Sequence, residues 1–583
     1  MGRQETRKLM GATLLLASAL ALSVVMACGG GEPVVQTVVV EKPVEKLVEK
    51  TVIVEKPVEK LVERTVVVEK PVEKVVEKTV VVVQTATPGP ATPTPVPVKY
   101  IRGGEIRIGH NGDPDTLDTQ ATPQYVSWRV NELVYSGLVR HNENMELIPE
   151  LAASWKFQTP TTLVLTLRDG LKFHDGSALT AADVKFSLER VALPDPNYVA
   201  ANRAELSSIE RVDAIDSKTV QVNLKTTFAP LLGFLALPPN YIISKAFTEA
   251  RASDIKTVAN GAGPFKLVRW QPGVKLETEA FKDYWEKGVP YVDKLTYYPM
   301  GDAVTRTTAL LSGQVDMIIL PQSTDIPKIV THKDLMLAPG VVWGSFRGWM
   351  MLMDKSPLDK VEVRQALNYA TDRQQLINLA ASGYAKPLSI SLIDPSSPFY
   401  ADPASYLKRD TAKAKELMAK AGLSGGVKLI GATSQGDSLG RAVLPVLQQQ
   451  WKEIGVDMEI QVVENAVYDK MTREGAFHFT SLSATDVLGD PDVLFRYNSK
   501  FQAVYNPFKD AEVDRLLDAG RVELDPVKRK EVYAQAQKRL DELAPSLMFM
   551  RINDQYAQNR QLKGFVFMPN RFLSMLRYSW VER

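Results

Sequence analysis

The sequence predicts a large mixed α/β region, residues 99–583, preceded by a secretory signal and a repetitive stalk. Segments with two-residue apolar alternation are interleaved with segments that carry helix-capping residues. A single cysteine ends an N-terminal apolar run, and a repeat separates this run from the rest of the chain. Since 70 lysines and arginines nearly balance 68 aspartates and glutamates, we expect no nucleic-acid partner.

The N-terminus is typical of a secretory signal peptide, residues 1–27. Three basic residues precede an uncharged run, Leu9 to Ala27, which ends at Cys28. The last four residues of this segment, Val25 to Cys28, resemble a bacterial lipoprotein box, in which the cysteine becomes the lipidated first residue of the mature protein. The resemblance implies an extracytoplasmic protein anchored to the cell membrane through Cys28. An uncleaved anchor stays open as an alternative, because about 20 apolar residues suffice to span a bilayer.

Residues 28–98 are predicted to form an extended stalk. A fourteen-residue unit rich in valine, glutamate and lysine recurs from Thr37. Each full unit contains a proline, which costs about 3 kcal/mol inside a helix, and valine triplets favour extended backbone. The apolar residues also fit heptad positions, so a self-associating coiled coil remains an alternative. Thr85 to Pro97 reads as a stiff linker of threonine and proline.

The globular region reads as strands and helices of an α/β fold. Strands are expected at 163–167, 219–224 and 456–463 from their alternation. Helices are expected after the capping box at 180–183, over 411–421 and over 525–543. Residues 427–463 read as strand, helix and strand, the unit of a parallel sheet. Pro445 should kink this helix or mark its start.

Short motifs along the same region resemble the family 5 extracellular solute-binding proteins, the oligopeptide-, dipeptide- and nickel-binding components of ABC importers. Their order and spacing carry the resemblance, and they lie at residues 104–118, 134–138, 149–155, 167–176, 261–266, 283–285, 310–316 and 363–373. The resemblance implies a two-lobed, periplasmic-binding-protein-like clamp of type II with the extra subdomain of this family.

The same resemblance implies how the clamp is divided and what it does. Lobe I would comprise residues 99–340 and 545–583, and lobe II residues 341–544. A peptide or peptide-like solute would bind between the closing lobes and pass to ABC permease subunits. We expect the globular part to be a monomer, with no cofactor.

An esterase is the remote alternative. Residues 436–440 fit the G-x-S-x-G elbow around Ser438, between a predicted strand and helix. Only His478 lies downstream to complete a triad, so Ser438 is expected instead to cap its helix, and we expect no catalysis. Five histidines well apart in sequence suggest no zinc site. The aspartates at 113, 115 and 118 lack the glycine and glutamate of an EF-hand, so no metal is expected.

The ligand site can be assigned only through the resemblance and chain position. Peptide-binding members carry a lobe II aspartate that pairs with the peptide amine, near an Asp-Pro-Asp turn. Here that turn is 490–492, and Asp486 lies one residue further from it than is usual. The other candidates for the cleft wall are Arg347, Trp349, Trp343, Gln120, Tyr125 and Tyr505. An arginine would bind a carboxylate and aromatic rings would stack on the ligand. Without Asp486, an oligosaccharide or other uncharged solute is the alternative.

Overall fold

The structure, a computed structural model, describes residues 100–340, 345–501, 508–552 and 555–583, and four two-residue strands before them. The chain divides into two compact units, Met1–Lys99 and Tyr100–Arg583. In the first unit, β1 (Thr37–Val38) pairs with β4 (Val81–Val82), and β2 (Val48–Glu49) with β3 (Val67–Val68). The signal peptide and Cys28 lie outside the described residues. No helix in the described ranges is both long and apolar enough to cross a membrane.

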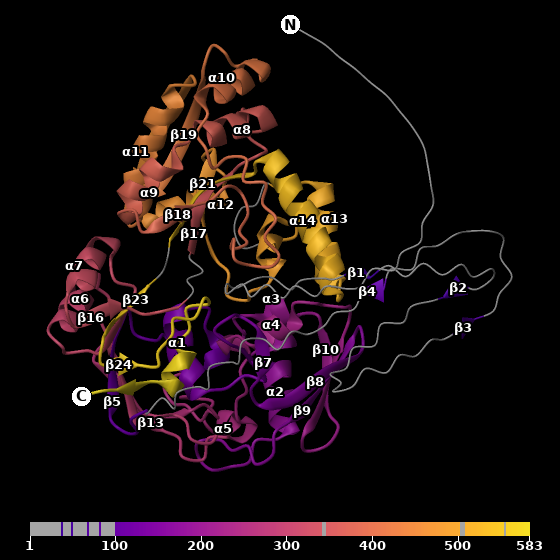
Figure 1. Cartoon of the computed structure of the whole chain (residues 1–583), viewed down its shortest axis with the longest axis vertical. Coiled ribbons are helices and arrows are strands. Elements are labelled where there is room, and N and C mark those ends of the chain that lie inside the picture. Colours follow the sequence, from indigo (N-terminus) through magenta and orange to yellow (C-terminus); the bar gives the residue numbers. More distant parts are fainter. Residues whose placement is uncertain are drawn as a thin grey trace, which may run out of the picture. The chain divides into compact units, whose positions relative to one another are not determined.

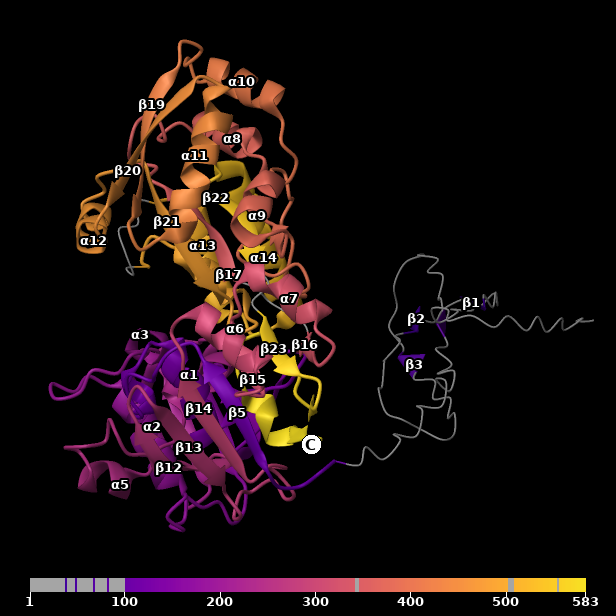
Figure 2. The ribbon, with the colours of Figure 1, turned by 90° about the vertical axis from the view of Figure 1, so that its left-hand side faces the viewer.

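The second unit begins with the main sheet of the first lobe, of which Figure 1 labels β5, β13, β16 and β23. This sheet has seven strands in the order β12-β13-β14-β5-β15-β23-β16, all labelled in Figure 2. Its strands are β5 (Glu105–His110), β12 (Phe265–Gln271), β13 (Lys275–Ala280), β14 (Lys294–Pro299), β15 (Met317–Ile319), β16 (Leu335–Leu337) and β23 (Tyr556–Asn559). The central β5 runs parallel to β14 and β15. Accompanying helices are α1 (Tyr125–Val134), α6 (Ala303–Leu311) and α7 (Ile326–Thr331).

A four-stranded antiparallel sheet forms the extra subdomain of this lobe, in the order β10-β11-β9-β8. Its strands are β8 (Ala152–Thr159), β9 (Thr162–Leu167), β10 (Ile209–Ala214) and β11 (Thr219–Leu224). The helices are α2 (Ala181–Ala192), α3 (Arg203–Leu206), α4 (Leu231–Leu235) and α5 (Lys245–Ala250), and β6 (Val139–His141) pairs with β7 (Leu147–Pro149). The predicted capping box of Thr180 and Asp183 is confirmed at the start of α2.

The second lobe is built on a six-stranded sheet in the order β18-β22-β17-β21-β19-β20. Its strands are β17 (Ser345–Met351), β18 (Ala385–Pro387), β19 (Val427–Ser434), β20 (Val456–Val463), β21 (Phe479–Thr485) and β22 (Ser546–Ile552). The helices are α8 (Val361–Ala370), α9 (Arg373–Ala381), α10 (Thr411–Lys420), α11 (Ser438–Lys452), α12 (Asn465–Arg473), α13 (Ala511–Val522) and α14 (Pro526–Leu543). Figure 2 shows α8, α9 and α11 on one side of this sheet.

The predicted parallel unit at 427–463 is confirmed, since β19 and β20 pair in parallel around α11. Two details of its helix differ from expectation. Asp437 caps α11 by accepting a hydrogen bond from Gly440 N, so Ser438 is the first helical residue and not the cap. Pro445 lies inside the helix and does not start it. The apolar face that includes Leu444 and Leu447 is fully buried, which holds the helix together across the proline.

The boundary between the lobes also differs from the one expected at 545. β22 pairs with β17 and belongs to the second lobe up to Ile552, whereas β23 belongs to the first lobe from Tyr556. The chain therefore returns to the first lobe between these strands. The other crossing lies between β16 and β17, which belong to different sheets.

Gly261 and Gly263 allow two segments of the first lobe to approach closely, as the sequence suggested. A Cβ atom on Gly261 would lie 2.0 Å from the carbonyl oxygen of Val134. Because backbone atoms on both sides must move, Gly261→Ala should lower the free energy of unfolding by about 2 kcal/mol. Gly301→Ala is the control, since nothing lies within 4 Å of its added methyl. Equal urea midpoints for both variants would contradict the close approach.

Candidate ligand site between the lobes

Two central strands of the second lobe bring Arg347 and Asp486 toward the same end of the sheet. Ser345 pairs with Thr485, and Arg347 with Ser483, in the β17–β21 ladder. The Arg347 guanidinium donates hydrogen bonds to the Ser483 hydroxyl and to the carbonyl oxygen of Phe346. Asp486 follows directly after Thr485, where β21 ends. Arg347 therefore lies opposite Ser483, three residues before the predicted acid on the neighbouring strand.

Asp486 is a buried acid in a tight loop. It is 3% exposed, and its Oδ1 accepts hydrogen bonds from the backbone N–H groups of Leu488 (3.1 Å) and Gly489 (3.0 Å). Burial, and to a smaller extent the charge on Asp490, raise the pKa of Asp486 to about 7 against the opposing effect of the backbone donors. A cation beside Asp486 would restore its charge at neutral pH.

The first lobe contributes Tyr125 and two arginines to the same region. The guanidinium carbons of Arg129 and Arg571 lie 6.0 Å and 5.9 Å from the centre of the Tyr125 ring. Arg129 is one turn along α1 from Tyr125, and its Nε donates to the carbonyl oxygen of Arg571 at 3.3 Å. Arg571 also donates to the Ser345 hydroxyl of β17, so it joins the two lobes.

Electrostatic effects on Tyr125 show which charged groups surround it. Burial raises the pKa of Tyr125, while Arg571, Arg129 and Arg496 lower it and Asp486 raises it. Arg496 belongs to the 3-10 segment Pro491–Tyr497 that follows the Asp486 loop. A phenol of one lobe is thus within reach of cations from both lobes and of the buried acid. This arrangement can hold a solute that carries both an ammonium group and a carboxylate.

The remaining predicted site residues do not join this group. The Gln120 amide donates to the carbonyl oxygens of Ser187 (3.1 Å) and Tyr241 (3.2 Å), and its oxygen accepts from Arg190, which leaves nothing for a ligand. Trp349 is 3% exposed and stacks on Phe549 at 5.1 Å, in the core. Trp343 and Tyr505 lie outside the described residues.

The residues of the predicted esterase alternative are engaged elsewhere. Ser438 begins α11, and no hydrogen bond between it and His478 occurs in the described part of the chain. The Nδ1 of His478 instead accepts a hydrogen bond from Ile430 N at 2.9 Å. Among the described residues, no group of three or more histidine, cysteine, aspartate or glutamate side chains is placed to hold a metal ion.

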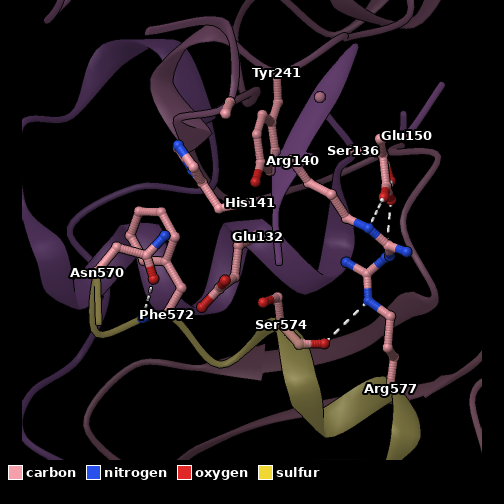
Figure 3. Close-up of a pocket in the computed structure, with 12 residues that line it drawn as sticks. Glu132, Ser136, Arg140, His141, Glu150, Tyr241, Asn570, Phe572, Ser574 and Arg577 are labelled. Atoms are coloured by element: carbon pink, nitrogen blue, oxygen red, sulfur yellow. Dashed lines mark hydrogen bonds and ion pairs between the residues drawn. The ribbon is translucent and has the colours of Figure 1, made fainter. Parts of the chain in front are cut away.

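An internal pocket lies inside the first lobe (Figure 3). It is lined by Glu132, His141, Glu150, Asn570, Phe572 and Arg577 among others. Its charged groups already contact one another, because Arg577 and Arg140 both pair with Glu150 at 2.9 Å and 3.0 Å. We assign this pocket to the stability of the lobe and not to solute binding.

Glu132 in this pocket should make stability depend on pH. Burial raises the pKa of Glu132 to about 8, although the Leu573 N–H, Arg577 and Arg129 oppose this shift. The folded state therefore keeps a proton that the unfolded state loses above about pH 4.3. Stability should fall between pH 5 and 8 by at most about 1.4 kcal/mol per pH unit.

Glu132→Gln tests this expectation, since it keeps a neutral side chain at every pH. In urea unfolding at pH 5, 6.5 and 8, this variant should lose less stability with rising pH than the wild type. Glu279→Gln, at an exposed position, should follow the wild type. Parallel profiles for wild type and Glu132→Gln would show that Glu132 is ionised in the folded state.

Comparisons with known proteins agree with this architecture. Residues 146–505 match the model of bacterial extracellular solute-binding proteins, family 5 (middle region). The chain is 30% identical over 476 residues to the glutathione-binding protein GsiB of Pectobacterium atrosepticum. This match covers 79% of this chain and 91% of GsiB. GsiB of Escherichia coli (strain K12) is 29% identical over 482 residues, with 80% and 92% coverage.

Solved structures of similar fold are also solute-binding proteins. The binding protein AgaA from A.tumefacien R10, in complex with agropinic acid, is 31% identical with a TM-score of 0.70, covering 82% of this chain and 99% of AgaA. The ABC transporter substrate binding protein CtaP of Listeria monocytogenes is 25% identical with a TM-score of 0.74, covering 83% and 100%. The chain belongs to the family 5 bacterial extracellular solute-binding proteins.

Proposed function

We propose that this protein is the membrane-anchored binding component of an ABC importer and that it captures a peptide or peptide-like solute between its two lobes. The observation that carries the ligand class is that Tyr125 has the guanidinium groups of Arg129 and Arg571 over its ring and is also affected by the charge of the buried acid Asp486. An ammonium group would bind Asp486, and a carboxylate would bind Arg347 in the bidentate manner that guanidinium favours.

The comparisons support the ligand class and the role in an ABC importer. Relatives near 30% identity are named as glutathione-binding proteins, and one solved relative holds agropinic acid. CtaP is described as an ABC transporter substrate binding protein, which supports permease subunits as the partner. Because the relatives are binding proteins, we infer that this chain binds its solute without chemical change.

The lobes meet through direct contacts that a moving clamp would make and break. Leu488 of the second lobe lies against Gly233 of the first, and Ala229 N donates to the Arg521 carbonyl oxygen at 2.7 Å. The same loop carries Asp486, so a solute that binds this acid would also stabilise the contact between the lobes. Ligand binding should therefore favour a closed pairing of the lobes.

A thermal-shift panel on the full chain in detergent tests the function. Glutathione, dipeptides, tripeptides and neutral oligosaccharides would each be added, with mass spectrometry to follow their fate. We expect a peptide-like compound to raise Tm and to be recovered unchanged. Hydrolysis of an added ester that is lost in Ser438→Ala would instead favour the esterase.

The proposed lipid anchor is tested at Cys28. Cys28→Ser removes the only thiol of the chain, and firm attachment takes more than one acyl chain, so the variant should leave the membrane fraction. Fractionation of cells followed by immunoblotting measures this. If Cys28→Ser still sediments fully with membranes, an uncleaved N-terminal anchor is the better interpretation.

A further inference from the structure

Several buried or half-buried arginines in the described part of the chain have strong partners. Arg521 and Arg529 form two-pronged ion pairs with Asp492 (2.6 and 2.7 Å) and Asp490 (2.6 and 2.7 Å). Arg364 and Arg373 have no carboxylate partner among the described residues, but all three nitrogens of each guanidinium group donate to neutral oxygens, such as the carbonyl oxygens of Leu543 and Leu388. These four guanidinium groups are thus held either by a carboxylate or by a full set of neutral acceptors.

Three arginines of the candidate site, Arg129, Arg347 and Arg496, have neither, because fewer of their guanidinium nitrogens have a hydrogen-bond acceptor among the described residues. Within the described ranges, none of them has a carboxylate oxygen within the 4.0 Å of an ion pair. Arg129 bonds only neutral groups, namely Tyr556, Asn111 and the Arg571 carbonyl.

Arg347 and Arg496 have even fewer partners. In the described part of the chain, Arg347 bonds the Ser483 hydroxyl and the carbonyl oxygen of Phe346 and no other group. Among the described residues, the Arg496 side chain makes no hydrogen bond and has only the Phe501 ring at 5.5 Å. Burial lowers the pKa of both guanidinium groups. The charge of Asp437 only partly opposes this shift at Arg347, and Tyr125 and Glu205 only partly oppose it at Arg496. Such a cation is unfavourable unless an anion joins it.

We propose that the solute is net anionic, with one amine for Asp486 and at least two carboxylates for the guanidinium groups of Arg129, Arg347 and Arg496. This rests on the proposed function in taking the solute to be peptide-like. A peptide with an acidic side chain, or an amino-acid conjugate with two carboxylates, has this chemistry. A neutral peptide would leave at least one of the three cations, of which Arg129 is buried and Arg347 and Arg496 are half-buried, without a counter-charge.

The test compares solutes that differ by one carboxylate, on the full chain in detergent by calorimetry and thermal shift. The pairs are Ala-Glu-Ala with Ala-Gln-Ala, and glutathione with its glycyl ethyl ester. We expect the more acidic member of at least one pair to bind tenfold tighter or more. In Arg496→Met, the two members of that pair should bind with nearly equal affinity.

The unliganded variants separate a binding role from a structural one. Arg496→Met removes a cation without a carboxylate partner, so its Tm should stay equal or rise. Arg190→Met is the control, because Arg190 pairs with the buried Asp118 at 2.7 Å. It should lower Tm and keep the preference for the acidic member. A fall in Tm for Arg496→Met similar to that for Arg190→Met would overturn the proposal.

The outcomes also distinguish this inference from the proposed function. Equal binding within both pairs would overturn the inference and leave a peptide receptor. If no peptide binds but citrate stabilises the wild type and not Arg496→Met, the anion site stands and the peptide-like class is wrong. Absence of binding by the peptides and by citrate would count against both.

Discussion

Asp486→Asn should weaken the binding of a peptide-like solute with a free amine by about a hundredfold. The substitution keeps an oxygen that can accept from the Leu488 and Gly489 N–H groups, but it removes the counter-charge of a buried ammonium. Loss of one partner of such a pair costs roughly 3 kcal/mol or more. Calorimetric titration of the wild type and the variant measures the difference.

N-acetylation of the solute should cause a loss similar to that of Asp486→Asn. The two losses should not add, because both remove the same contact. Asp518→Asn, at an exposed carboxylate of the same lobe, should bind like the wild type. Unchanged affinity in Asp486→Asn would reject the role of Asp486. Tolerance of N-acetylation as well would favour an uncharged solute such as an oligosaccharide.

Glu150→Ala should lower the free energy of unfolding by about 3–5 kcal/mol, the usual range when one partner of a buried ion pair is removed. Glu150 is 1% exposed and accepts from Arg577 (2.9 Å) and from the Tyr284 hydroxyl (2.8 Å), with Arg140 Nε at 3.0 Å. Without the carboxylate, two arginines in the pocket of Figure 3 would lose their counter-charge.

The pH dependence of this network runs opposite to that of Glu132. Burial alone would raise the pKa of Glu150, but Arg577 and Arg140 hold it below its usual range. Its stabilisation is therefore present at neutral pH and is lost as the pH falls through the lowered pKa. Urea unfolding at pH 7 measures the effect, with the exposed Glu146→Ala as the control. Equal midpoints for these two variants would show that the network is dispensable.

Local patterns predicted the elements of the fold well because each pattern has a local cause. Two-residue alternation located β9, β11 and β20, and the cap at Asp525 located the start of α14. The lobe boundary was less accurate. β22 is buried on both faces, and such a run does not show which sheet it joins, since that depends on its pairing with β17.

The site was only partly predictable, because it too depends on how distant segments pack together. Arg347, Asp486 and Tyr125 were predicted from position, and the structure places them in one region, where their role as ligand contacts stays a prediction. Trp349 lies on the same strand face as Arg347, but further along β17, where Phe549 covers it. Residue spacing cannot show which residues of a strand are covered by neighbouring side chains.

The arginines near Tyr125 carried little signal in the sequence. Arg129 follows Tyr125 by one helical turn, so it could have been inferred once Tyr125 was chosen. Arg496 and Arg571 lie on segments without periodicity, and Arg571 adopts a left-handed backbone with φ of 67°. Their approach to Tyr125 depends on how the two lobes meet, which no local pattern encodes.

A crystal structure of the protein with a bound solute tests the central claim most directly. We predict density between the lobes, with an amine of the solute against Asp486 and carboxylates against Arg347 and Arg496. Leu488 should remain packed on the first lobe in this complex. A solute bound outside the group of Tyr125, Asp486 and Arg347, with these side chains in contact only with protein, would contradict the account.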